Sequence, residues 1–121
     1  MKTLILSCAI ILTLSLGALN VIYADSATWN ANPIDNNWNN PANWTPNTVP
    51  NGPNDVATFA VSNQTDVTIS ASTEVNELVF SPGASDFTID VTEGKTFTIS
   101  GTGIIGYVNS CASPHSCSAC A

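Results

Sequence analysis

The stretch Asp66-Val67-Thr68-Ile69-Ser70 (DVTIS) decides the fold, because it returns twenty residues later as Asp86-Phe87-Thr88-Ile89-Asp90 (DFTID). In both copies apolar and polar residues alternate and β-branched residues are frequent, which is typical of a half-buried strand. A second match, shifted by nineteen residues, aligns Thr73, Glu74, Leu78 and Phe80 with Thr92, Glu93, Phe97 and Ile99. A unit of about twenty residues that carries two strands is therefore expected to occur twice.

The same alternation marks several short strands along the chain, and no helical periodicity appears after residue 24. The expected strands are residues 56–59, 67–69, 78–80, 87–91 and 97–99. Turn-forming residues separate them, namely Asn63, Ser81-Pro82-Gly83, Glu93-Gly94, Gly101 and Gly103. The sequence therefore predicts an all-β fold.

A fixed period of this size favours a stacked solenoid, in which each unit makes one coil and its inward side chains meet those of the neighbouring coils. The predicted fold is a short parallel β-helix, or β-solenoid, whose repeats cover residues 55–106. A β-sandwich also has short strands at intervals of roughly 8–12 residues, and it remains the alternative.

The first 24 residues have the order of a secretory signal peptide. Lys2 precedes an apolar run over residues 4–16, and Ile22-Tyr23-Ala24 forms a candidate cleavage site before Asp25. The apolar run is short and interrupted for a membrane span. We therefore expect export, removal of residues 1–24, a secreted or cell-surface location and no stable membrane span afterwards.

Beyond residue 24 the chain has one lysine, Lys95, no arginine and all nine acidic residues. A surface with this balance repels phosphate groups and anionic membrane surfaces. Nucleic acid is therefore not an expected partner.

Residues 25–54 form a segment rich in Trp, Asn and Pro, with all three tryptophans of the chain: Trp29, Trp38 and Trp44. Proline withholds a backbone donor and asparagine closes turns with its own side chain, so an irregular segment is expected. Large flat rings on such a loop suit a cap over the first coil of a solenoid, whose exposed ladder would otherwise invite aggregation.

The order of these features resembles the amino-terminal part of secreted passenger-type β-solenoid proteins of Gram-negative bacteria, which are autotransporter-like and carry passenger-associated β-strand repeats. The resemblance covers roughly residues 28–106, and its motifs are Asn43-Trp44, residues 54–59 (NDVATF), 75–80 (VNELVF) and 97–104 (FTISGTGI). It implies a right-handed parallel β-helix, a surface location and no catalytic residues. Surface glycans or other solenoid chains are the partners that it suggests.

The alternative function is a small carbohydrate-binding module. Trp29, Trp38 and Trp44 would stack on sugar rings, and the neighbouring amides of Asn37, Asn39, Asn40 and Asn43 would bind hydroxyl groups.

Other groups of reactive side chains are expected to have structural roles. Asp86 with Asp90, or Glu74 with Glu77, has the composition of a glycosidase pair, but the aspartates alternate with apolar residues and should face solvent. Residues 51–55 (NGPND) lack the spacing of a calcium loop and are expected to form a turn.

The tail, residues 107–121, contains Cys111, His115, Cys117 and Cys120, a set of side chains that can bind zinc. Outside the cell these thiols would instead oxidise. We expect no metal, no cofactor and no catalytic site, and the predicted function is a non-catalytic structural or adhesive module.

Overall fold

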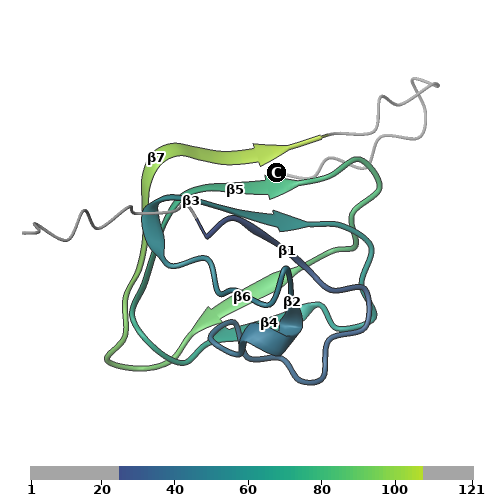
Figure 1. Ribbon diagram of the computed structural model, residues 1–121, viewed down its shortest axis with the longest axis horizontal. Helices are drawn as coiled ribbons and strands as arrows, with labels where there is room; N and C mark the ends of the chain where they lie inside the picture. Colours follow the sequence, from purple (N-terminus) through teal and green to yellow (C-terminus); the bar gives the residue numbers. More distant parts are fainter. Residues whose placement is uncertain (1–24, 108–121) are drawn as a thin grey trace, which may run out of the picture.

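The computed structural model describes residues 25–107, which form seven β-strands and one short 3-10 helix (Figure 1). The elements are β1 (Ala27–Trp29), η1 (Pro41–Asn43), β2 (Trp44–Thr45), β3 (Gly52–Phe59), β4 (Asp66–Ile69), β5 (Thr73–Phe80), β6 (Thr88–Val91) and β7 (Phe97–Gly106). The all-β prediction is confirmed, and each of the five expected strands overlaps an observed one. Among these residues no helix has the length and apolar character to cross a membrane.

The strands after residue 50 alternate between two sheets. The larger sheet has the order β2-β1-β3-β5-β7, and β4 and β6 form the smaller one. The neighbours β1/β3, β3/β5, β5/β7 and β4/β6 are parallel, whereas β1 and β2 are antiparallel. The chain therefore returns to the same sheet with every second strand, and Figure 1 shows β3, β5 and β7 side by side.

The register of these parallel pairs differs from the sequence repeat. Val67 lies beside Ile89, two residues beyond Phe87, with which the repeat aligned it. The repeat also aligned Thr73 with Thr92, but Thr73 lies beside Phe97. The twenty- and nineteen-residue offsets of the sequence matches are therefore not the offsets of the ladders. The shift of two residues in the β4/β6 pair keeps every side chain on the same face of the strand, so alternation in the sequence does not distinguish that register. The β5/β7 register is shifted from the sequence match by an odd number of residues, from Thr92 to Phe97.

Gly101 and Gly103 lie inside β7 and not in a turn, contrary to the prediction. The β5/β7 ladder is irregular here, because Val75 pairs with Ile99 and Glu77 pairs with Gly103. Gly103 has φ = +101°, and a Cβ atom on Gly101 would overlap the side-chain oxygen of Asn76. Both glycines thus permit a bulge, where a larger residue would be strained or would clash.

The segment predicted to be irregular contains regular pairing as well. Trp29 lies in β1 and Trp44 in β2, where the two residues pair directly. β3 begins at Gly52, three residues before the expected boundary. Its ladder with β5 is interrupted between Gly52 and Val56, so Pro53 lies where regular pairing is suspended.

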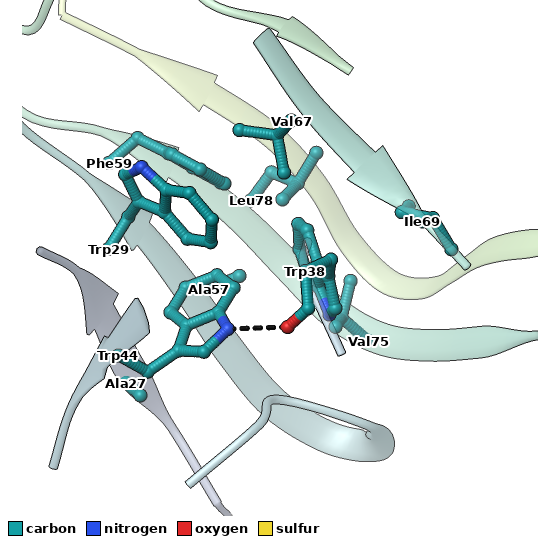
Figure 2. Packing of buried hydrophobic residues seen from close by; sticks show 10 residues of the cluster. All are labelled: Ala27, Trp29, Trp38, Trp44, Ala57, Phe59, Val67, Ile69, Val75 and Leu78. Carbon is teal, nitrogen blue, oxygen red and sulfur yellow. Dashed lines mark hydrogen bonds between the residues drawn. The ribbon is translucent and has the colours of Figure 1, made fainter. Parts of the chain in front are cut away.

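The core lies between the sheets and extends into the tryptophan segment (Figure 2). Its buried apolar residues are Ala27, Trp29, Trp38, Trp44, Ala57, Phe59, Val67, Ile69, Val75 and Leu78. At the β6 and β7 side the apolar residues are only partly buried: Phe87, Ile89, Phe97 and Ile99. Burial is thus complete next to the tryptophans and incomplete at the other end of the strand stack.

Candidate functional site

The three tryptophans are completely enclosed. Trp29 has 1% of its surface exposed, and Trp38 and Trp44 have 0%. Each indole N–H donates to a backbone carbonyl: Trp29 to Gln64 at 3.0 Å, Trp38 to Pro50 at 3.1 Å and Trp44 to Trp38 at 2.7 Å. Figure 2 shows the last of these bonds. The rings are therefore both buried and satisfied as donors, which is what burial of an indole requires.

Trp44 packs edge to face on Trp29 and on Trp38, and all three indoles surround Phe59. The centroid of Trp44 lies 5.1 Å from that of Trp29 and 4.8 Å from that of Trp38, and each of the three indoles lies within 6.2 Å of Phe59. Trp38 also reaches Phe97 of β7 at 5.2 Å. Such aromatic pairs add roughly 0.5–1.5 kcal/mol each beyond the burial of their area, so this cluster is a centre of stability.

Asn43 holds the loop that carries Trp38 and Trp44, residues 34–44, which we call the cap loop. Its side-chain oxygen accepts from the backbone N–H groups of Ile34 at 2.9 Å and Asp35 at 3.3 Å. Its amide nitrogen donates to the Asp35 carboxylate at 2.6 Å and to the Asn37 carbonyl at 2.9 Å. A buried amide with all these partners is fully satisfied, so Asn43 substitutes for regular backbone pairing.

The Asp35 carboxylate is the acceptor at the centre of this loop. It accepts from the backbone N–H of Asn37 at 2.9 Å and from the side chains of Asn40 at 2.7 Å and Asn43. These hydrogen bonds, led by the one from Asn37 N–H, hold the pKa of Asp35 below its ordinary value of 3.8 because they favour the charged form. The acid is thus part of the loop's framework.

The cap loop is joined to the outer edge of β4. Trp38 N–H donates to the Thr68 carbonyl at 2.9 Å, and Thr68 N–H donates to the Asn36 carbonyl at 2.8 Å. These bonds accompany a parallel bridge between Asn37 and Thr68. The loop thereby occupies the place of one more strand beside the smaller sheet.

Asn39 completes this attachment at the turn that follows β4. Its side-chain oxygen accepts from the backbone N–H groups of Ser70 and Ala71, both at 2.9 Å. Its amide nitrogen donates to the Thr73 hydroxyl at 3.1 Å. One asparagine side chain thus satisfies two backbone donors of the turn between β4 and β5.

The residues of the suggested carbohydrate site therefore lie close together, but their aromatic faces are not open to a sugar. Sugar stacking requires an exposed aromatic face, whereas the three indoles face the core. The side chains of Asn37, Asn39, Asn40 and Asn43 all make hydrogen bonds inside the protein. A tryptophan-based sugar platform does not agree with this burial.

The carboxylate pairs are not enclosed. Asp86 and Asp90 are exposed, as predicted, but only Asp90 lies in a strand, because β6 begins at Thr88. Glu74 borders a polar surface depression of about 290 Å³ that is lined by Asn51, Ser72, Thr73, Glu74, Thr96 and Thr98. Across residues 25–107 no group of three potential metal ligands was found.

Asp55 was expected to belong to a turn, but it lies inside β3 and is 3% exposed. Its carboxylate accepts from the backbone N–H groups of Asp25 at 2.7 Å and Asn51 at 2.9 Å. The structural role of Asp35 was also missed, although the sequence Asp35-Asn36-Asn37 has the spacing at which an Asp side chain bonds the backbone two residues on.

Some sequence predictions lie outside the described residues. They concern the signal peptide, residues 1–24, and Cys111, His115, Cys117 and Cys120 of the tail. Comparisons of the chain with protein-family models, curated proteins and solved structures found no significant match.

Proposed function

We propose that this protein is a non-catalytic, secreted or cell-surface module that is built as a short parallel β-solenoid and has a structural or adhesive role. The observation that carries the proposal is the chain path. β3, β5 and β7 are successive parallel neighbours in one sheet, and β4 and β6 in the other. A coil that visits two sheets in turn produces this order, whereas antiparallel hairpins and Greek keys are usual in sandwiches.

The cap loop supports the same proposal. Solenoids need an atypical terminal unit, because the end of a coil exposes ladder groups and apolar side chains. Here β1 extends the larger sheet beyond β3, and the cap loop bonds to the edge of β4. The enclosed tryptophans fill the space between these two segments.

The exposed side chains suit an extracellular scaffold. The outward residues of β6 and the first half of β7, including Thr88, Asp90, Thr98 and Ser100, are exposed and polar or acidic. Such a surface favours solubility and repels anionic partners. An adhesive role would use the hydroxyl and carboxylate groups of these outer faces, with surface glycans as one class of partner.

The solenoid is tested by its register in solution. Nuclear Overhauser contacts are expected between the backbones of Val67 and Ile89 and of Val75 and Ile99, the partners in the two ladders. A sandwich that lacks parallel β4/β6 and β5/β7 ladders would not show these contacts, and their absence would overturn the proposed fold.

The adhesive role is tested with beads coated with the exported protein. The beads are expected to adhere to glycan-coated surfaces more strongly than beads coated with albumin, and the tryptophan emission should stay unchanged when soluble glycan is added. Adhesion no greater than that of albumin would leave only the structural role. A strong change in tryptophan emission would instead support the carbohydrate-binding alternative.

A further inference from the structure

The two ends of the strand stack differ. At one end, the outer edges of β6 and β7 have no partner strand among residues 25–107. We call these two edges, with the inward side chains of their strands, the open end. In the ladders, Ile89 lies over Val67, Val91 over Ile69, Ile99 over Val75 and Ile104 over Leu78. Each buried apolar residue of β4 and β5 is thus followed by an apolar residue at the open end.

These last apolar residues remain accessible. Val91 is 41% exposed and Ile104 is 64% exposed, although the core residues beneath them are exposed by 3% or less. The last layer of the core at the open end therefore consists of apolar side chains. An unpaired strand edge next to apolar side chains is a surface that pairs readily with another chain.

The opposite end does not offer a matching surface. In the smaller sheet, the cap loop already bonds the outer edge of β4 through Trp38 and Thr68. In the larger sheet, the outer edge of β1 is already paired with the two-residue strand β2. Head-to-tail stacking would have to displace the cap loop. The surface that complements the open end without rearrangement is the open end of another copy.

We propose that two copies of this chain associate open end to open end about a two-fold axis. β7 would lie antiparallel to β7 of the second copy and β6 to its counterpart, so that both ladders continue across the contact. The contact is self-complementary, because the same apolar residues of each copy face one another, and it closes at two copies. The inference rests on the proposed solenoid and adds a partner to it.

The size of the open end predicts a weak dimer. β7 has ten residues and spans at most about 33 Å, β6 has four and spans about 13 Å, and each sheet with its outer side chains is about 10 Å wide. The end face therefore covers on the order of 500 Å² per copy, less than the ~800 Å² of a standard interface. The excess of acidic residues also opposes association, so added salt should strengthen the dimer by screening repulsion.

Analytical ultracentrifugation of the exported protein tests this proposal. A reducing agent is included so that Cys111, Cys117 and Cys120 form no intermolecular disulfides. We expect a reversible monomer–dimer equilibrium, with more dimer at 0.5 M than at about 0.1 M NaCl, where the Debye length is ~10 Å. Ile104→Asp and Val91→Asp should each weaken association at least tenfold, because each would place a carboxylate in the apolar contact.

The matched controls are apolar residues of similar exposure away from the open end. Ile34 is 72% exposed in the cap loop, and Val61 is 66% exposed after β3. Ile34→Asp and Val61→Asp should leave the equilibrium unchanged. Circular dichroism melts of all four variants identify any loss that results from unfolding.

Three outcomes would overturn the dimer. They are a monomer at every accessible concentration, equal weakening by the control variants, and growth into species larger than two copies. The backbone contacts between Val67 and Ile89 are measured on the same sample. If they persist in a monomer, the dimer proposal fails while the solenoid stands; if they are missing, the fold itself is wrong.

Discussion

At the scale of single residues, Asn43 shows how a loop without regular ladders is held in place. The side chain is buried and makes four hydrogen bonds, two as acceptor and two as donor. This single side chain bonds the backbone N–H groups of Ile34 and Asp35, the Asp35 carboxylate and the Asn37 carbonyl. A hydrophobic residue of the same volume would remove all four hydrogen bonds and would leave the Asn43 position without polar contacts to the rest of the cap loop, so it should destabilise this loop.

Trp44 offers the sharpest test of the enclosed cluster. Trp44→Ala should lower the free energy of unfolding by about 3–5 kcal/mol, because it removes a buried ring and leaves a cavity. Trp44→Phe keeps part of the packing but loses the bond from the indole N–H to the Trp38 carbonyl, so its cost should be smaller. Urea denaturation measures both variants.

The control for this test is Ile34→Ala, since Ile34 is 72% exposed in the same loop. Its effect should stay within about 0.5 kcal/mol, as for surface changes. A wild-type midpoint for Trp44→Ala would show that the ring is not enclosed in solution.

The hydrogen bonds of Asp35 predict that the stability of the cap loop decreases in acid. Hydrogen bonds from Asn37, Asn40 and Asn43 lower the pKa of Asp35 in the folded protein. Its contribution to stability is therefore fully present above the unfolded value of about 3.8 and is lost as pH falls through the lower folded pKa. Asp35→Asn should be less stable than wild type at pH 7, and the difference should shrink as pH is lowered toward 2.

Thermal melts of the two proteins between pH 7 and 2 give this comparison. Asp86→Asn is the control, because Asp86 is exposed and has no hydrogen bond of this kind in the described structure. A difference between Asp35→Asn and wild type that is independent of pH would contradict the role of the Asp35 charge.

At the scale of the elements, the register between β5 and β7 changes partway along the ladder, because β7 contains a bulge. The bulge places five residues of β7, from Ile99 to Gly103, opposite three residues of β5, from Val75 to Glu77. The extra length leaves Ile104 in register with Leu78 and so continues the apolar column of the core. A regular ladder of the same sequence would bring different residues beside Leu78.

Gly101→Ala should destabilise the protein by roughly 1–3 kcal/mol, the usual cost of overpacking. Its new methyl group would overlap the Asn76 side chain and lie 3.0 Å from the Asn76 backbone oxygen. Gly106→Ala is the matched control in the same strand, because a Cβ atom there meets nothing within 4 Å. Chemical denaturation of the two variants compares them, and equal midpoints would show that the side chain of Asn76 moves away at little cost.

At the scale of the whole molecule, negative charges far outnumber positive ones. Residues 25–107 contain nine acidic residues and one lysine. Mutual repulsion of these acids opposes the compact state, and salt screens it. The melting temperature should therefore rise when NaCl is increased from about 0.01 to 0.5 M, over which the Debye length falls from ~30 Å to only a few Å.

Glycerol at matched osmolality controls for solvent effects that do not depend on charge. Asp90→Asn removes one exposed acid of β6, so it should raise the melting temperature at low salt and reduce its salt dependence. A melting temperature that falls with NaCl would mean that attractive charge pairs outweigh the repulsion.

The sequence by itself determined the class of fold and the approximate position of the strands. Alternation of apolar and polar residues is local, so the strands containing Val67 and Ile99 could be predicted without knowledge of their partners. The composition of residues 25–54 likewise indicated that side chains, and not a long ladder, would hold Trp38 and Trp44. These inferences depend only on neighbours along the chain.

Tertiary structure alone decided the register, the bulge and the direction in which the tryptophans face. Pairing Val67 with Ile89 instead of Phe87 preserves the alternation, so only packing between strands selects it. Burial of Trp44 depends on Trp29, Phe59 and a carbonyl group six residues away, contacts that composition does not specify. The physical reason is that periodicity records which face a side chain occupies, whereas register and burial arise from non-local contacts that form only when the strands meet.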